Sequence, residues 1–211
     1  MHELSMLDNG LKILTVTMPH VQSATIGFFI RVGSRFESAP LAGATHFIEH
    51  MLFKGTPKHP TAREIAEAIE GRGGIFNAST GLEATLYWAK VAATHAPAAL
   101  DVLSEMLLNS NFAQEDIEIE RSVITEEIKY AFDAPDSLVQ LLVNELQWPG
   151  HPLGRDIAGT LHSVNDLTRD SLLGYMAAHY NPADTVLALA GLVDHAQAFN
   201  WAEAYLSGWQ A

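Results

Sequence analysis

The chain has 211 residues, of which 48% are hydrophobic and 18% charged, a composition that is ordinary for a globular protein with a sizeable core. It contains no cysteine, which excludes disulfides and leaves His, Asp and Glu as the side chains that could hold a metal. The formal net charge of −13 disfavours contact with phosphate backbones, so we expect no nucleic-acid partner. No apolar run approaches the roughly 18 residues that a membrane span needs, and the first residues lack the pattern of a secretory signal or a transit peptide. We therefore expect no membrane partner and a cytoplasmic location.

The first half of the chain predicts two hairpins with helices between them. Asn9-Gly10 is a strong turn signal between two short strand-like segments. Thr61-Ala-Arg-Glu64 has the form of a capping box, which opens a helix. In chain order we expect strands at 3–7, 11–17 and 24–32, helices at 45–52 and 61–71, and strands at 75–80 and 84–92.

The second half is mainly helical by its apolar periodicity. We expect helices at 96–108, 114–130, 137–146 and 166–181, then a buried strand at 185–192 and a last helix at 196–206. Hairpins join most of the strands, and the helices cluster between the later ones. This order predicts an α+β fold with a mostly antiparallel sheet and helices packed on one face. A doubly wound parallel sheet is disfavoured, because strands and helices do not alternate regularly.

The clearest chemical signal is the segment His46-Phe47-Ile48-Glu49-His50. On a helix, His46 and His50 lie one turn apart on the same face, so both imidazoles can reach one metal ion. Glu49 leans toward that face, where a carboxylate that does not bind the metal can act as a general base for water. This order of residues is that of the inverted zinc peptidases. The alternative is a chance match, with two ordinary helix histidines in contact.

Zinc needs at least a third protein ligand, and the helix expected at 114–130 offers three glutamates. Glu120 and Glu127 are seven residues apart, so they fall on nearly the same side of that helix, beside apolar residues. A carboxylate on an apolar face is costly unless it is paired, protonated or bound to a metal. Glu126 points about 100° away and is expected to face solvent. The residues alone leave a metal ligand and a solvated charge run equally open.

The segment from His46 to Thr56 resembles the signature of the family that includes pitrilysin, insulin-degrading enzyme and mitochondrial processing peptidase. Further likenesses to this family run along nearly the whole chain, at 7–11, 73–87, 121–128 and 151–155. The resemblance implies the N-terminal half of a zinc metallopeptidase that hydrolyses peptide bonds.

The resemblance also implies a role for individual residues. These roles are metal ligand (His46, His50 and Glu127), catalytic base (Glu49), support of the ligands (Glu120) and binding of substrate (Asn77, Ala78 and Thr80). The implied cofactor is Zn²⁺, and the implied substrate is a peptide or an unfolded polypeptide that adds as an extra strand to a sheet edge.

Subunits of that family contain two homologous halves, and this chain is similar to the first. We therefore expect 1–211 to be a single zinc-binding catalytic domain without the second half. Its expected partners are a C-terminal half, a partner subunit or further copies of the chain, and alone it should hydrolyse peptides poorly or not at all. Two other classes stay open. A non-catalytic assembly subunit would lose metal on purification, whereas a peptide-binding module would bind peptides equally with and without a chelator.

Overall fold

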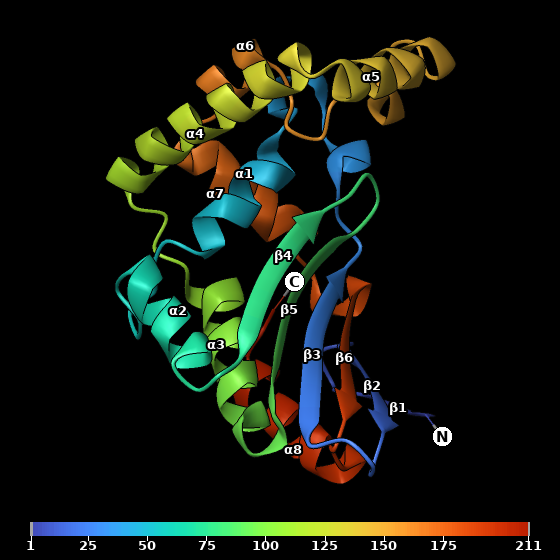
Figure 1. The fold of residues 1–211 in the computed structure, drawn as a ribbon, viewed down its shortest axis with the longest axis vertical. Coiled ribbons are helices and arrows are strands. Elements are labelled where there is room, and N and C mark those ends of the chain that lie inside the picture. Colours follow the sequence, from blue (N-terminus) through green and yellow to red (C-terminus); the bar gives the residue numbers. More distant parts are fainter. Residues whose placement is uncertain (1, 211) are drawn as a thin grey trace.

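The computed structural model of the chain describes residues 2–210. Within this range six strands form one mixed sheet in the order β1-β2-β6-β3-β5-β4 (Figure 1). Their bounds are β1 His2–Met6, β2 Lys12–Thr17, β3 Ser23–Ile30, β4 Ile75–Thr80, β5 Thr85–Ala92 and β6 Thr185–Gly191. The two edge strands are therefore β1 and β4, and the last strand of the chain lies in the middle of the sheet.

Both predicted hairpins are present. Asn9-Gly10 turns β1 into β2, and Gly10 has a φ of 91°, a conformation that glycine adopts without strain. β4 and β5 form the second hairpin, and all strand pairs are antiparallel except β2 with β6. The parallel pair arises because β6 returns after a long helical segment and inserts between β2 and β3.

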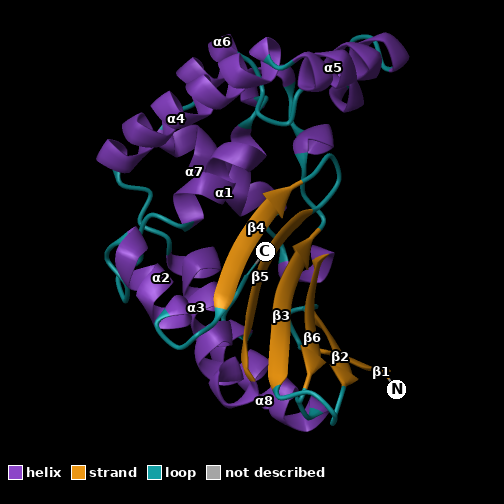
Figure 2. Ribbon diagram, viewed as in Figure 1, coloured by secondary structure: helices purple, strands orange, loops and turns teal. Residues whose placement is uncertain are grey.

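Eight α-helices lie in the described part of the chain (Figure 2). Their bounds are α1 Ala44–Leu52, α2 Ala62–Glu70, α3 Ala96–Asn109, α4 Gln114–Asp133, α5 Pro135–Gln147, α6 Leu161–Asp166, α7 Arg169–His179 and α8 His195–Leu206. α3 and α8 contact strands of the sheet on one face, whereas α1 and α2 lie beside the edge strand β4. None of the described helices combines the length and the apolar character needed to cross a membrane.

The core lies between the sheet and the helices on one face. Side chains of the sheet alternate, and those on the helix side are buried, as Ile26, Phe28 and Tyr87 are. The buried apolar side chains form one cluster in space. Its members range from Leu7 to Trp209, so residues from both ends of the chain share it. The predicted α+β fold, with its mostly antiparallel sheet and helices on one face, is confirmed.

The helix expected at 166–181 is present as α7 but is shorter, and a short helix before it was not expected. α6 ends at Asp166 and α7 begins at Arg169, with Leu167 and Thr168 in extended conformation between them. Thr160 and Thr168 each cap a helix by accepting a hydrogen bond from the backbone of a serine three residues later. A capping box with serine in its last position is a weaker signal in sequence than one with glutamate, which is how the start of α2 was predicted.

Candidate metal centre

Helix α1 has an apolar face and a face that carries the motif residues. Phe47, Ile48 and Met51 are fully buried against the core, at the spacing that gives a helix one apolar face. His46, Glu49 and His50 lie on the other side and are only partly buried. The long helix α4 crosses α1 on that side, and the two helices are in contact (Figure 1). The predicted motif thus faces α4 and the end of β4.

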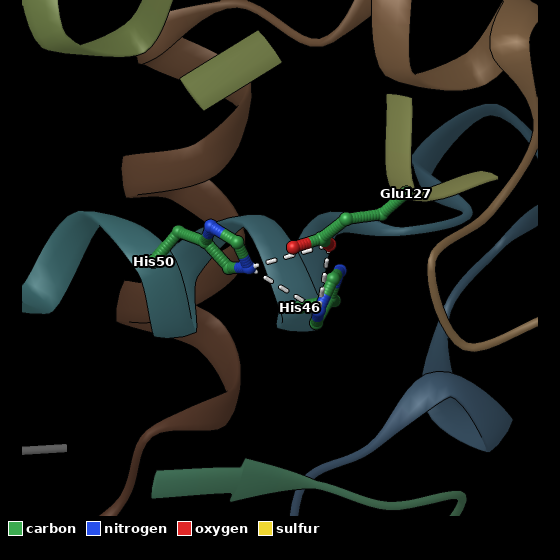
Figure 3. Close-up of side chains that lie close together, drawn as sticks. All are labelled: His46, His50 and Glu127. Atoms are coloured by element: carbon green, nitrogen blue, oxygen red, sulfur yellow. Dashed lines mark hydrogen bonds and ion pairs between the residues drawn. The ribbon is translucent and has the colours of Figure 1, made fainter. Parts of the chain in front are cut away.

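His46, His50 and Glu127 converge on one point between α1 and α4 (Figure 3). The Nε2 atoms of the two histidines are 3.3 Å apart, and an Oε2 atom of Glu127 lies 3.8 Å from His46 and 3.7 Å from His50. Two ligands of a tetrahedral zinc ion, each about 2.0–2.1 Å from the metal, lie about 3.3 Å from one another. The distance between the two histidines equals this value, and the two distances to Glu127 exceed it by about half an ångström, so the three atoms lie close to the arrangement of three zinc ligands.

The protonation of the histidines also suits a metal. Nδ1 of His50 lies 2.8 Å from Oε2 of Glu120, so Nδ1 carries the proton and Nε2 presents its lone pair. Burial, together with the nearby His50, lowers the pKa of His46 to about 4. His46 is therefore a neutral imidazole near neutral pH, which is the form that binds metals.

Glu120 is held by His50 of α1 and by Lys54, which lies in the turn just after that helix. It is 3% exposed, and besides His50 it contacts Lys54, whose Nζ lies 2.5 Å from Oε1. A buried carboxylate is costly without such partners, so Lys54 and His50 together make the position of Glu120 tenable. The carboxylate in turn fixes the ring of His50, a support that histidine ligands of metals commonly have.

We expect Glu120→Gln and Lys54→Met each to weaken zinc binding, by about ten- to a hundredfold. The first change removes the carboxylate that orients His50, and the second removes the cation that holds this carboxylate in place. Chelator competition measures the affinity, with Lys129→Met as the matched control because Lys129 pairs with exposed Glu126. Equal affinity in all variants would show that Glu120 is only a structural residue.

Glu49 is separate from the three converging groups and lies beside β4. The hydroxyl of Thr80 donates a hydrogen bond to Oε2 of Glu49. Among the described residues, Glu49 is not part of the set that could hold a metal together with His46, His50 and Glu127. A carboxylate next to a metal site, but outside its ligands, is suitably placed to act as a base.

β4 is an edge strand, and no other strand of residues 2–210 pairs with its outer side. The amide of Ala78 faces this outer side, since it donates to Oδ1 of Asn77 at 2.8 Å instead of to β5. The structure brings Thr80 to Glu49, but the side chain of Asn77 belongs to the opposite face of the strand. The predicted substrate residues thus lie on a free edge beside the site, and a peptide that pairs with Ala78 must displace the side chain of Asn77.

Sequence reasoning missed Lys54 as a part of this site. Lys54 follows His50 by four residues and lies in the turn just after α1, where it contacts the same carboxylate as His50. That spacing is the one signal that would have suggested a shared partner. The contact between Thr80 and Glu49 had no signal in sequence, because the strand and the helix are 31 residues apart.

His46 and His50 on one helix, with Glu49 between them and Glu127 opposite, have the arrangement expected of an inverted zinc-peptidase motif. The sequence model of the insulinase family, peptidase family M16, matches residues 12–161. The chain therefore belongs to this family, as its resemblance predicted. A second model, described as the inactive domain of the same peptidases, matches residues 166–211.

Several relatives carry the name zinc protease. One from Streptomyces coelicolor is 44% identical over 90% of this chain and 41% of its own length. Another from Rickettsia felis is 40% identical over 97% of this chain and 49% of its own length. Both are uncharacterised zinc proteases by name, which agrees with the predicted metal. The chain spans less than half the length of these relatives.

Solved structures share the fold at lower identity. A protease from Helicobacter pylori superposes on 100% of this chain and 51% of its own, with a TM-score of 0.95 and 23% identity. The periplasmic protease PqqL from Escherichia coli superposes on 99% of this chain and 24% of its own, with a TM-score of 0.89 and 24% identity. These likenesses concern the fold.

Proposed function

We propose that this chain is the zinc-binding half of a metalloendopeptidase, with the ion held by His46, His50 and Glu127. The observation that carries the proposal is the convergence of these three side chains at the spacing of zinc ligands. Family membership and the names of the relatives support it. When bound, zinc would polarise the scissile carbonyl and acidify a water molecule.

The residues around the ligands perform the remaining tasks. Glu49 takes a proton from the attacking water and later delivers it to the leaving amine. Thr80 holds the carboxylate of Glu49 by its hydrogen bond, which keeps the base beside the end of β4. The free edge of β4 binds the peptide as an added strand, so its backbone runs past Glu49.

The sheet face away from α3 and α8 supports the need for a second half. This face carries exposed or half-exposed apolar side chains around a hollow floored by Gly27 and Ala188, namely Leu14, Val16, Phe29, Leu86 and Trp88. The central strands are thus apolar on both faces, which is typical of strands that are covered on both. Since the relatives are about twice as long, we propose their C-terminal half as the partner that covers this face.

Peptide cleavage by the reconstituted protein tests the proposed function. The zinc-loaded chain is incubated with a pool of synthetic peptides, alone and with the C-terminal half of the Streptomyces coelicolor relative, and the products are identified by mass spectrometry. We expect cleavage that a chelator abolishes and that the second half increases, because an enclosed site orients the peptide. Phe29→Asp should prevent association with the second half, whereas Ile119→Asp, at an exposed site on α4, should not.

Other outcomes would point to the other classes. Peptide binding that is insensitive to chelator, with no cleavage under any condition, would favour a peptide-binding module. A chain that holds no zinc after purification would favour a non-catalytic assembly subunit. The cytoplasmic location stays a prediction from the sequence.

A further inference from the structure

The first turn of α1 has no cap of its own. Its N-cap residue is Gly43, which has no side chain to accept a hydrogen bond and has a φ of 91°. A Cβ atom at this position would lie 2.5 Å from the carbonyl oxygen of Ala158, so a capping side chain cannot replace the glycine. The free N–H groups at the start of this helix therefore need an acceptor from elsewhere in the chain.

Glu37 supplies that acceptor from the preceding loop. Its Oε2 accepts from the amide of Gly43 at 2.8 Å, and its Oε1 accepts from the amide of Thr45 at 2.7 Å. The side chain is 3% exposed, and its negative charge lies at the positive end of the helix dipole. Arg155 holds the loop from outside, since its Nη2 donates to the backbone oxygen of Glu37 at 3.2 Å.

The two metal-site histidines differ in how they are supported. The ring of His50 is oriented by Glu120, but Nδ1 of His46 is buried and has no hydrogen-bond partner among the described residues. The place of the His46 ring therefore depends on packing and on its backbone. That backbone follows directly after Thr45, whose amide Glu37 holds.

We propose that Glu37 is a positioning residue of the metal site, which fixes the first turn of α1 and thereby the ring of His46. This inference rests on the proposed role of His46 as a zinc ligand. Glu37 acts through the backbone and does not reach the ligands themselves. Glu37 positions His46 through the backbone, whereas Glu120 orients His50 by a direct contact with its ring.

A loss of zinc affinity that exceeds any loss of stability separates this role from a merely structural one. Burial raises the pKa of Glu37, so keeping its charge inside already costs stability. Glu37→Gln removes that cost together with one of the two acceptors, which moderates the net effect on folding. Asp194→Ala is the matched control, because Asp194 caps α8 by accepting from the amide of Gln197 at 3.0 Å. α8 lies at the far end of the molecule from α1 (Figure 1).

The test measures zinc affinity by chelator competition and the visible absorption of the Co²⁺-substituted protein. Both are recorded at a temperature where circular dichroism shows each variant folded. We expect Glu37→Gln to bind zinc about tenfold or more weakly and to change the cobalt spectrum, as loss of a support for a ligand does. Asp194→Ala should lower the unfolding midpoint without either effect. If Glu37→Gln does not fold, Glu37→Asp carries the test, because the shorter side chain cannot reach both amides.

The outcomes distinguish this inference from the proposed function. Wild-type protein that binds no metal would overturn the metal site and this inference together. Tight binding by wild type and an equal affinity and spectrum in the Glu37 variant would overturn the role of Glu37 alone. A loss no greater than that in Asp194→Ala would do the same.

Discussion

Glu49→Gln is expected to keep zinc and to lose hydrolysis by about a hundredfold to ten-thousandfold. The amide has nearly the shape of the carboxylate, so it can still accept the hydrogen bond of the Thr80 hydroxyl. It cannot take a proton from water, and a general base typically accelerates a reaction by about a hundredfold to ten-thousandfold. His46, His50 and Glu127 are untouched, so metal content should not change. Zinc analysis and peptide cleavage in the reconstituted protein measure the two effects separately.

Thr80→Val is the companion variant for the same carboxylate. It removes the hydroxyl that contacts Glu49 and keeps the base itself, so we expect a smaller loss of rate than in Glu49→Gln. The control is Glu64→Gln on α2, an exposed acid whose hydrogen bonds go to Thr61 and not to the site, and it should cleave like wild type. Undiminished turnover in Glu49→Gln would show that another group takes the proton.

Local signals in the sequence predicted most of the elements. The Asn9-Gly10 turn, the capping box at Thr61 and the second hairpin depend on neighbours along the chain, and all three are confirmed. The place of β6 had no such signal, because its partners β2 and β3 lie more than 150 residues earlier. A buried apolar strand could occupy any central position in a sheet. Its sequence therefore does not predict which strands flank it or that it pairs in parallel with β2.

The site residues within helix α1 were predictable from the sequence. Those that depend on the contact between α1 and α4 were less so. The spacing of His46, Glu49 and His50 follows from helix geometry alone. Periodicity could not choose among the glutamates of α4, since the choice depends on how α4 crosses α1. Glu120 is buried and Glu127 is half-exposed, although the two were expected on the same side of the helix. Lys54 pairs with the buried carboxylate of Glu120, and it lies in the turn after α1 and not on α4.

Variants of two neighbouring glutamates, whose side chains point in different directions, test the third ligand. Glu127 points to the two histidines, whereas Glu126 is exposed and pairs with Lys129 at 2.7 Å. We expect Glu127→Gln to lower zinc affinity by at least about a hundredfold, because a neutral amide oxygen is a much weaker ligand than a carboxylate. Glu126→Gln changes the charge of the same helix equally, and it should bind zinc like wild type.

Zinc content per chain, measured after purification without chelators, decides between two arrangements. About one zinc in wild type and in Glu126→Gln, with little in Glu127→Gln, would mean that this half-length chain assembles the ligands by itself. Equal loss in both variants would mean that the charge of α4 matters and not the direction of one side chain. Full zinc in Glu127→Gln would remove Glu127 from the ligands. The third ligand would then have to come from another residue or from the partner half.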